Sequence, residues 1–303
     1  MARKKIRPPG IPDARELWEL AKASVLAWNN DYAPSMGAAI AYYTLFSIAP
    51  LLIIVTAIAG FFFGEEAAQG EIFGQIRGLL GEEGALAIQG LVKSASEPAE
   101  GFLALLIGIV AMVIGATAVF GELQSAMDRI WRAPAAQQSG GIMGLFRARL
   151  FAFGMVLGVA FLLLVSLVVS AGISALGALW SAVFGGWELV LQIVNIVVSL
   201  IIFTGVFAMI YRFLPRISVS WRDVWTGAAI TSVLFVIGKF LIGLYIGSSG
   251  VVSGFGAAGA LAALLIWVYY SAQIFLLGAE FTWAHAHKYG SRAADAKYRK
   301  SAK

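Results

Sequence analysis

Long apolar runs separated by polar stretches dominate the pattern of this sequence. The first long run, residues 37–63, contains no charged side chain. A helix needs about 20 apolar residues, each rising about 1.5 Å, to cross a hydrocarbon core of about 30 Å. Further runs of this kind cover residues 101–121, 150–176, 187–211, 224–246 and 255–283. The pattern predicts an all-α integral membrane protein with six transmembrane helices in one domain, residues 37–283.

Three polar stretches flank or interrupt these runs. Residues 1–36 are basic and then amphipathic, with Leu20, Ser24 and Trp28 on one face of an expected helix. This helix either lies on the membrane surface or is a short solvated leader helix. Residues 64–100 are rich in acid and predict one or two amphipathic helices on the outer surface. Residues 284–303 form a basic tail.

Composition supports a membrane protein over a soluble one. Hydrophobic residues make up 60% of the chain and charged residues only 13%, whereas about a quarter of a soluble domain is charged. The mean hydropathy is +0.83. No cysteine is present, so thiol chemistry and disulfides are excluded. The first 36 residues are too polar to predict a cleavable signal peptide.

The distribution of Lys and Arg predicts the orientation in the membrane. All of them except Arg77, Lys93 and Lys239 fall in the N-terminal segment, the loop after residue 121, the turn after residue 211 or the C-terminal tail. By the positive-inside rule both termini are cytoplasmic, in a bacterial inner membrane. The sequence pI of about 9.5 therefore reflects topology, and we expect lipids rather than nucleic acid as partners. Pairs of small residues leave a homo-oligomer possible.

Polar groups and a proline distinguish the first span from a simple anchor. Tyr42, Tyr43 and Ser47 bring hydroxyl groups into it, and Pro50 removes a backbone donor near its middle. The proline predicts either an ordinary kink or a broken helix that lines a substrate path. Ser47 is expected to satisfy backbone groups that the proline frees.

Lys239 lies inside an expected span, where a charged side chain is costly and by default functional. Gln192 and Asn195 reach a similar depth in the preceding span, so the three predict a shared polar pocket. The alternative is that Lys239 extends its long stem to the outer headgroups.

A second polar layer is expected near the cytoplasmic ends of the spans. Gln273 lies there and joins the candidates for a substrate path. We expect Glu122 or Glu280 to pair with Arg129, Arg212 or Arg216, because buried carboxylates usually pair with cations. A structural clamp is favoured over a proton relay. The clamp candidates are Glu122, Asp128, Arg129, Arg212, Arg216 and Glu280.

Catalytic and metal-binding motifs are not indicated. The sequence Gly254-x-Gly256-x-x-Gly259 matches a dinucleotide fingerprint but lacks the strand and βαβ unit that the motif requires. His285 and His287 are two residues apart and fall on different faces of a helix. We therefore expect no enzyme, no cofactor and no metal site.

The sequence resembles the YihY/BrkB family of bacterial inner-membrane proteins, formerly labelled ribonuclease BN, over residues 25–285. The resemblance implies an all-helical fold. Family members have been linked to tRNA processing, to virulence and to envelope lipid or solute transport. Asp128 departs from the Asn that the family pattern leads us to expect. The residues that carry the resemblance are Ala41-Tyr42-Tyr43, Ser47, Pro50, Leu123, Ile130-Trp131, Tyr211, Pro215, Gly227-Ala228, Trp267, Tyr269-Tyr270-Ser271-Ala272 and Leu277-Gly278-Ala279-Glu280.

Four functions are compatible with these observations. The first hypothesis is a transporter that moves a lipid or another amphiphile, with the outer amphipathic helices bordering a lipid-facing opening. The second is an ion- or proton-coupled carrier of small solutes that uses Lys239 and Glu280. A membrane scaffold without transport and a tRNA-processing nuclease are the remaining alternatives.

Overall fold

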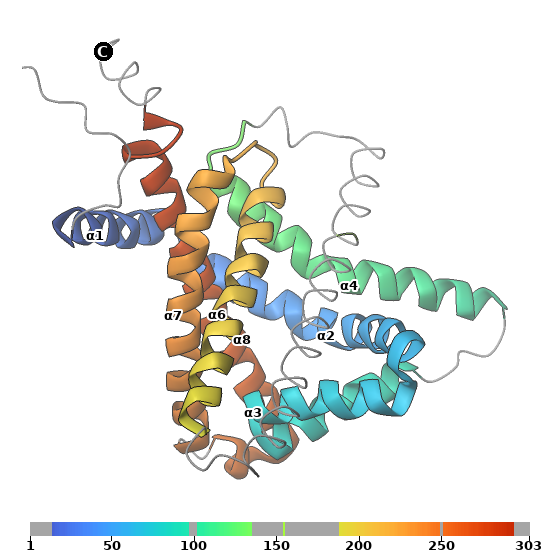
Figure 1. Cartoon of the computed structure of the whole chain (residues 1–303). Coiled ribbons are helices and arrows are strands. Elements are labelled where there is room, and N and C mark those ends of the chain that lie inside the picture. Colours follow the sequence, from blue (N-terminus) through green and yellow to red (C-terminus); the bar gives the residue numbers. More distant parts are fainter. Residues whose placement is uncertain (1–13, 97–101, 135–153, 155–187, 249–250, 294–303) are drawn as a thin grey trace, which may run out of the picture.

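Helices make up all the regular structure that the computed structural model describes (Figure 1). The described residues are 14–96, 102–134, 154, 188–248 and 251–293. The all-helical prediction is therefore confirmed for these residues. The helices are α1 (Ala14–Asn30), α2 (Ala33–Phe63), α3 (Glu65–Ser96), α4 (Phe102–Ile130), α6 (Glu188–Phe213), α7 (Trp221–Ser248) and α8 (Val251–Lys288).

Four of the helices contain segments long and apolar enough to cross a membrane. These segments are Ala33–Phe61, Ile196–Phe213, Trp221–Ile246 and Leu261–Lys288. They correspond to the predicted spans 37–63, 187–211, 224–246 and 255–283. The predicted span 101–121 lies within α4, whereas 150–176 falls outside the described residues apart from residue 154. The count of six spans stays a prediction.

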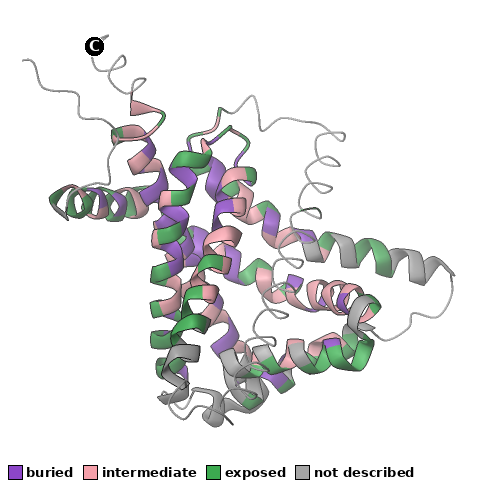
Figure 2. Ribbon diagram, in the orientation of Figure 1, coloured by how far each residue is buried: buried purple, intermediate pink, exposed green. Residues whose placement is uncertain are grey.

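The helices α6, α7 and α8 pack side by side, and we call them the three-helix bundle (Figure 1). Buried positions concentrate towards the end of the bundle where α4 ends and α7 begins (Figure 2). The main hydrophobic core lies there and includes Met127, Tyr211, Val224 and Leu276, all fully or almost fully buried. This end of the molecule is held by side chains from α2, α4, α6, α7 and α8.

The helices α2, α3 and α4 extend to one side of the bundle (Figure 1). The helix α2 contacts α3, α4 and α8 and so connects this layer to the bundle. In a straight helix Gln69 and Gln89 would be about 30 Å apart at about 1.5 Å per residue. Both line one cavity, so α3 bends back on itself. The predicted one or two outer helices at residues 64–100 correspond to this bent helix.

The predicted amphipathic helix near the N-terminus is confirmed as α1. Leu20 and Ser24 are buried, and Leu20 packs against Phe281 and Ala284 of α8. Trp18, on another face of the helix, is 69% exposed. The described part of α1 therefore has one face bound to the bundle and an apolar side chain left outside it. Its position on a membrane surface stays a prediction.

Of the two alternatives for Pro50, an ordinary kink and a broken helix, the broken helix is contradicted. The helix α2 continues through Pro50 from Ala33 to Phe63. Gly115 of α4 packs on the proline, since a Cβ atom built on this glycine would lie 3.1 Å from the Pro50 Cγ atom and 3.7 Å from the Phe46 carbonyl oxygen. In this turn of α2 the proline provides no backbone N–H to the Phe46 carbonyl oxygen. The close packing of α4 against the same turn helps to hold it in a helical conformation. Ser47 is buried, but its hydroxyl finds no hydrogen-bond partner among the described residues, so its expected capping role is also wrong.

Candidate functional site

A large open groove lies between the second half of α2 and both ends of α3. Its volume is about 1040 Å³, at the upper end of the ~300–1,000 Å³ typical of small-molecule sites. The chain turns sharply into this groove at Gly64, whose φ of 88° favours glycine. Most of the wall is apolar. The apolar side chains come from Ile53, Ala57, Phe61, Phe73, Leu86 and Val92.

Polar side chains occupy the same groove and come mainly from α3. Glu65 and Gln69 lie in its first two turns, and Gln89 and Lys93 lie near its end. The Gln69 Nε2 atom donates a hydrogen bond to Glu65 Oε1 at 3.2 Å. All four side chains are exposed. The groove therefore combines apolar walls with a polar and charged edge, which we call the rim.

Glycine keeps one wall of the groove open. A Cβ atom built on Gly90 would meet nothing within 4 Å, although Gly90 lines the groove. Gly74, also in α3, has equally open surroundings but does not line the groove. A large side chain at Gly90 would thus occupy the groove without forcing neighbouring atoms apart, and Gly74 provides a matched position outside it.

The structure does not bring the predicted path residues of α2 into this groove. Tyr42 and Tyr43 are 57% and 41% exposed, and the Tyr42 ring contacts that of Phe46 of its own helix in a tilted arrangement. Gln273 lies on α8 against the start of α2, where its Nε2 atom donates to the Ala33 carbonyl oxygen at 3.5 Å. Pro50 and Ser47 face packing contacts, as described above. These residues therefore do not form one site.

Lys239 is exposed on α7, beside the exposed Phe240. This position favours the interpretation that its side chain extends along the apolar surface. Gln192 and Asn195 lie on α6, but their side chains fall outside the described part of the structure. The shared polar pocket of these three residues therefore stays a prediction.

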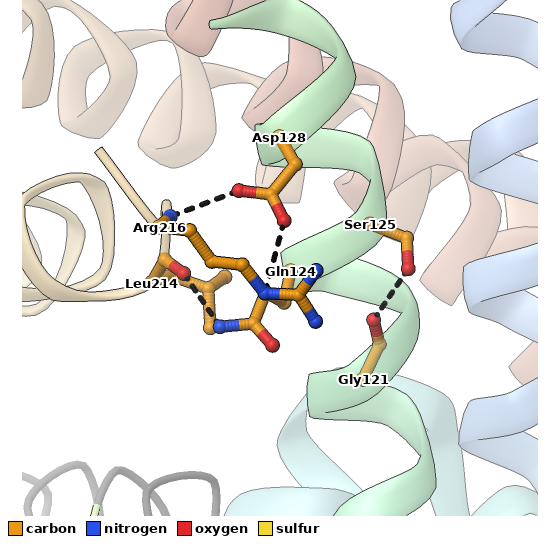
Figure 3. A network of polar contacts seen from close by, with 6 residues as sticks. All are labelled: Gly121, Gln124, Ser125, Asp128, Leu214 and Arg216. Carbon is orange, nitrogen blue, oxygen red and sulfur yellow. Dashed lines mark hydrogen bonds and ion pairs between the residues drawn. The ribbon is translucent and has the colours of Figure 1, made fainter. Parts of the chain in front are cut away.

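The clamp near the end of α4 forms around Asp128, which is 3% exposed (Figure 3). Asp128 Oδ1 accepts a hydrogen bond from the Arg216 backbone N–H at 2.9 Å, and Oδ2 lies 3.5 Å from the Arg216 Nε atom. One turn earlier, Gln124 Nε2 donates to the Leu214 carbonyl oxygen at 3.0 Å. Two side chains of α4 thus hold the turn between α6 and α7.

Burial raises the pKa of Asp128 above its ordinary value, and the Arg216 backbone N–H and guanidinium act in the opposite direction. Asp128 lies beyond the predicted end of the second span, at the level of the α6–α7 turn. The free-energy cost of removing water from the carboxylate is larger than the free energy gained from its interactions with Arg216. The hydrogen bond to the Arg216 backbone N–H is therefore the part of the clamp that positions the turn.

Arg216 pairs with Asp128 and not with Glu122 or Glu280, so the expected choice of carboxylate was wrong. The other two arginines of the predicted clamp lie over aromatic rings. Arg129 lies 5.4 Å from the ring centre of Tyr32, and Arg212 lies 5.8 Å from that of Trp221. Glu122 is partly exposed and makes no ion pair with the described residues. The sequence could not reveal which carboxylate the α6–α7 turn approaches.

Glu280 of α8 is the most deeply buried acid of the predicted layer, at 1% exposure. Its hydrogen-bond partner among the described residues is the side chain of Asp31. The charged side chains that act on it are Asp31, between α1 and α2, and Arg132, after α4. The Arg132 guanidinium lies 4.5 Å from the ring centre of Trp283. Arg132 is also one of two non-glycine residues with positive φ in the described chain, the other being Tyr32.

Sequence analysis did not identify Tyr211 as the polar centre of the three-helix bundle. Its hydroxyl donates to the Phe275 carbonyl oxygen at 2.7 Å and lies 3.0 Å from Thr231 Oγ1. Thr231 in turn donates to the Gly227 carbonyl oxygen at 2.8 Å. This network connects α6, α7 and α8 in a fully buried position. The only signal in the sequence was Tyr211 as one of the residues that carry the family resemblance.

Comparison with known proteins identifies the family of the chain. No group of three or more acidic or histidine side chains that could hold a metal lies within the described residues. A family model described as virulence factor BrkB matches residues 25–303. No solved structure matches the chain.

Several similar curated proteins are named UPF0761 membrane proteins. The protein of Tolumonas auensis is 29% identical over 264 residues, which cover 84% of this chain and 80% of the relative. The protein of Psychrobacter sp. is 26% identical, with 84% of this chain and 46% of the relative covered. The protein of Stenotrophomonas maltophilia is 26% identical, with 93% of this chain and 62% of the relative covered. The chain therefore spans less than two thirds of the last two relatives, and by its family match it belongs to the BrkB family of membrane proteins.

Proposed function

We propose that this protein binds a membrane amphiphile, such as a phospholipid, in the α2–α3 groove and moves it across or along the membrane. The observation that carries the proposal is an open groove of about 1040 Å³ with apolar walls and a charged rim. Acyl chains lower their free energy against apolar walls, and a headgroup needs polar partners. The positions of Lys and Arg further support an inner membrane with both termini cytoplasmic.

The packing of α2 supports a role for this groove in moving the amphiphile. The same helix forms one wall of the groove and packs through Met36 and Ile40 into the main core. A ligand that contacts α2 therefore contacts a helix fixed to the bundle. In contrast, the described side chains of α3 that line the groove are mostly exposed, so α3 can shift with less loss of packing.

The test is lipid movement in proteoliposomes that contain acyl-labelled fluorescent phospholipids. A membrane-impermeant reductant quenches only the label in the outer leaflet, so loss of the protected fraction reports movement. We expect movement by the wild type and a loss of at least about tenfold in Gly90→Trp, because the indole fills the groove. The control variant Gly74→Trp adds the same side chain to α3 outside the groove and should keep wild-type rates.

Two outcomes would contradict the proposal. Wild-type protein that moves no phospholipid above the level of empty liposomes would leave the groove without this function. Equal rates in Gly90→Trp and Gly74→Trp would place the lipid path elsewhere. Lys239→Ala is expected to retain movement, because Lys239 is exposed on α7 and does not line the groove.

A second candidate function is a proton-coupled carrier of small solutes, which the buried Glu280 favours. Its carboxyl group is buried beside the carboxyl group of Asp31, and a buried acid of this kind is costly and is often retained for function. The test is proton entry into liposomes loaded with a pH-sensitive dye, driven by a potassium diffusion potential. This candidate requires proton entry by the wild type and its loss in Glu280→Gln. Glu122→Gln, a partly exposed acid on α4, is the control.

A further inference from the structure

The rim of the α2–α3 groove presents one negative and one positive side chain from opposite ends of α3. Glu65 stands at the first residue of the helix and Lys93 in its last turn. Both line the same cavity because α3 bends back on itself. A rim that carries both signs of charge differs from the single-sign surface expected at a site for purely anionic lipid.

Neither charge is neutralised by an ion pair within the described residues. The three ion pairs there join Arg77 to Glu82, Arg216 to Asp128, and Lys288 to Glu19. Glu65 Oε1 accepts one hydrogen bond, from the Gln69 amide. With respect to the described residues, the carboxylate thus keeps acceptor capacity, and the Lys93 ammonium group has no partner that competes with a ligand.

Two uncharged amides accompany the charges. Gln69 lies one turn after Glu65 and Gln89 one turn before Lys93, and both line the groove. An amide both donates and accepts hydrogen bonds, so it suits either part of a headgroup that carries two charges. Lys93 with Gln89 provides donors for a phosphate group, and Glu65 provides an acceptor for an ammonium group.

A headgroup of one sign would fit this rim less well. A phosphoglycerol headgroup would bring its negative charge to Lys93 and would also meet the Glu65 carboxylate. A like-charge contact lowers the affinity for the wrong ligand, so it acts as a specificity element. A headgroup with both a phosphate and an ammonium group avoids this contact and uses both side chains.

We propose that the α2–α3 groove selects zwitterionic amphiphiles, of the phosphoethanolamine or phosphocholine type, over anionic ones. The proposal rests on the proposed function, because it concerns the same groove. Glu65 receives the ammonium end of the headgroup, Lys93 receives the phosphate, and the acyl chains lie along the apolar wall that includes Ile53, Phe73 and Val92.

The experiment measures movement of acyl-labelled phosphocholine and phosphoglycerol lipids in parallel proteoliposomes. We expect the wild type to move the zwitterionic probe about threefold faster or more, a ratio typical of exposed charged contacts. Glu65→Lys should reverse this preference, because two cations then face the headgroup. Lys93→Glu should slow both probes. The double variant Glu65→Lys with Lys93→Glu should restore the preference for the zwitterionic probe. Its headgroup then binds in the opposite orientation, with the phosphate at residue 65 and the ammonium group at residue 93.

The control is Glu66→Lys, since Glu66 is the exposed acidic neighbour of Glu65 and does not line the groove. It changes the net charge by the same amount and should keep the wild-type ratio. An unchanged ratio of the two probes in Glu65→Lys and in Lys93→Glu would overturn the proposed selectivity while lipid movement itself stands.

Equilibrium binding of the same two probes to the purified full-length protein, in an uncharged detergent, separates this inference from the proposed function. Binding that prefers the zwitterionic probe and reverses in Glu65→Lys supports the selectivity even where no lipid moves in liposomes. Binding of neither probe overturns the selectivity together with the amphiphile site.

Discussion

Gly227 and Gly278 of the three-helix bundle and Gly74 and Gly90 of α3 have opposite surroundings. In the bundle a Cβ atom on Gly278 would collide with Thr231 and lie 2.6 Å from the Tyr211 hydroxyl, and Gly227 is equally close to Thr282. In α3 a Cβ atom on Gly74 or Gly90 would meet nothing within 4 Å. Gly227 and Gly278 allow helices to touch, and Gly74 and Gly90 leave space beside α3. The comparison separates a fixed scaffold from a site with room for a ligand.

The largest expected effect follows from adding bulk to the bundle. Gly278→Val should lower the free energy of unfolding by about 3 kcal/mol or more, because the new side chain forces α7 and α8 apart at Tyr211 and Thr231. Thermal unfolding of the purified protein in detergent measures the change. Gly243→Val on α7 is the control, since nothing lies within 4 Å of a Cβ atom there. Similar losses in both variants would show that the two kinds of glycine do not differ.

The clamp at Asp128 gives the next effect. Asp128→Ala should cost about 2 kcal/mol, because the Arg216 backbone N–H and side chain lose their common acceptor. Asp128→Asn should cost clearly less, since the amide oxygen still accepts from the backbone N–H and the buried charge is gone. Equal losses in the two variants, measured by thermal unfolding, would mean that the charge and not the hydrogen bond holds the α6–α7 turn.

Removing the Tyr211 hydroxyl should have a moderate effect. Tyr211→Phe should cost about 1 kcal/mol, the usual worth of an interhelical hydrogen bond within a membrane. Thr231 still donates to the Gly227 carbonyl oxygen in this variant, so no buried donor loses its partner. A loss above about 3 kcal/mol would show that the network is more cooperative than its separate bonds. Thr226→Val, at a partly exposed position of α7, serves as the control.

The groove should tolerate bulk that the bundle does not. Gly90→Trp is expected to change the free energy of unfolding by no more than about 0.5 kcal/mol, because the side chain enters open space and helix propensity favours replacing glycine. The same variant is expected to lose lipid movement. Unfolding of Gly90→Trp as severe as that of Gly278→Val would remove the contrast between the two regions and also the value of this variant as a functional probe.

Sequence reasoning predicted the elements better than their contacts. The apolar runs gave four spans close to α2, α6, α7 and α8, because a membrane helix must satisfy all its backbone groups internally and so needs a long apolar run. The bend of α3 was not predicted, because the placement of Gln69 and Gln89 beside one cavity depends on packing against α2. A local pattern contains no information on such a placement.

The candidate site was predicted only in part. Asp128 and Arg216 were both expected in the clamp, but the partner of Arg216 depends on where the α6–α7 turn meets α4. The polar residues of α2 attracted attention because they are unusual in an apolar run, whereas Glu65 and Lys93 did not, since charges are ordinary outside the membrane. Glu65 and Lys93 are far apart in the sequence, and only the three-dimensional fold brings them to the same groove.

The smallest effect is expected at the exposed contact between α1 and α8. The Lys288 Nζ atom lies 2.7 Å from Glu19 Oε2, and this hydrogen bond with the charge of Lys288 holds the pKa of Glu19 below its ordinary value. A lowered folded-state pKa contributes stability above the ordinary pKa of Glu19 and loses it as the pH falls through the folded value. Lys288→Gln should therefore speed hydrogen exchange in α1 by about twofold or less at pH 7. The difference from wild type should vanish at acidic pH, where Glu19 is protonated in both proteins. A large difference that persists in acid would mean that Lys288 holds α1 by packing rather than by charge, and α1 would then belong to the fixed scaffold.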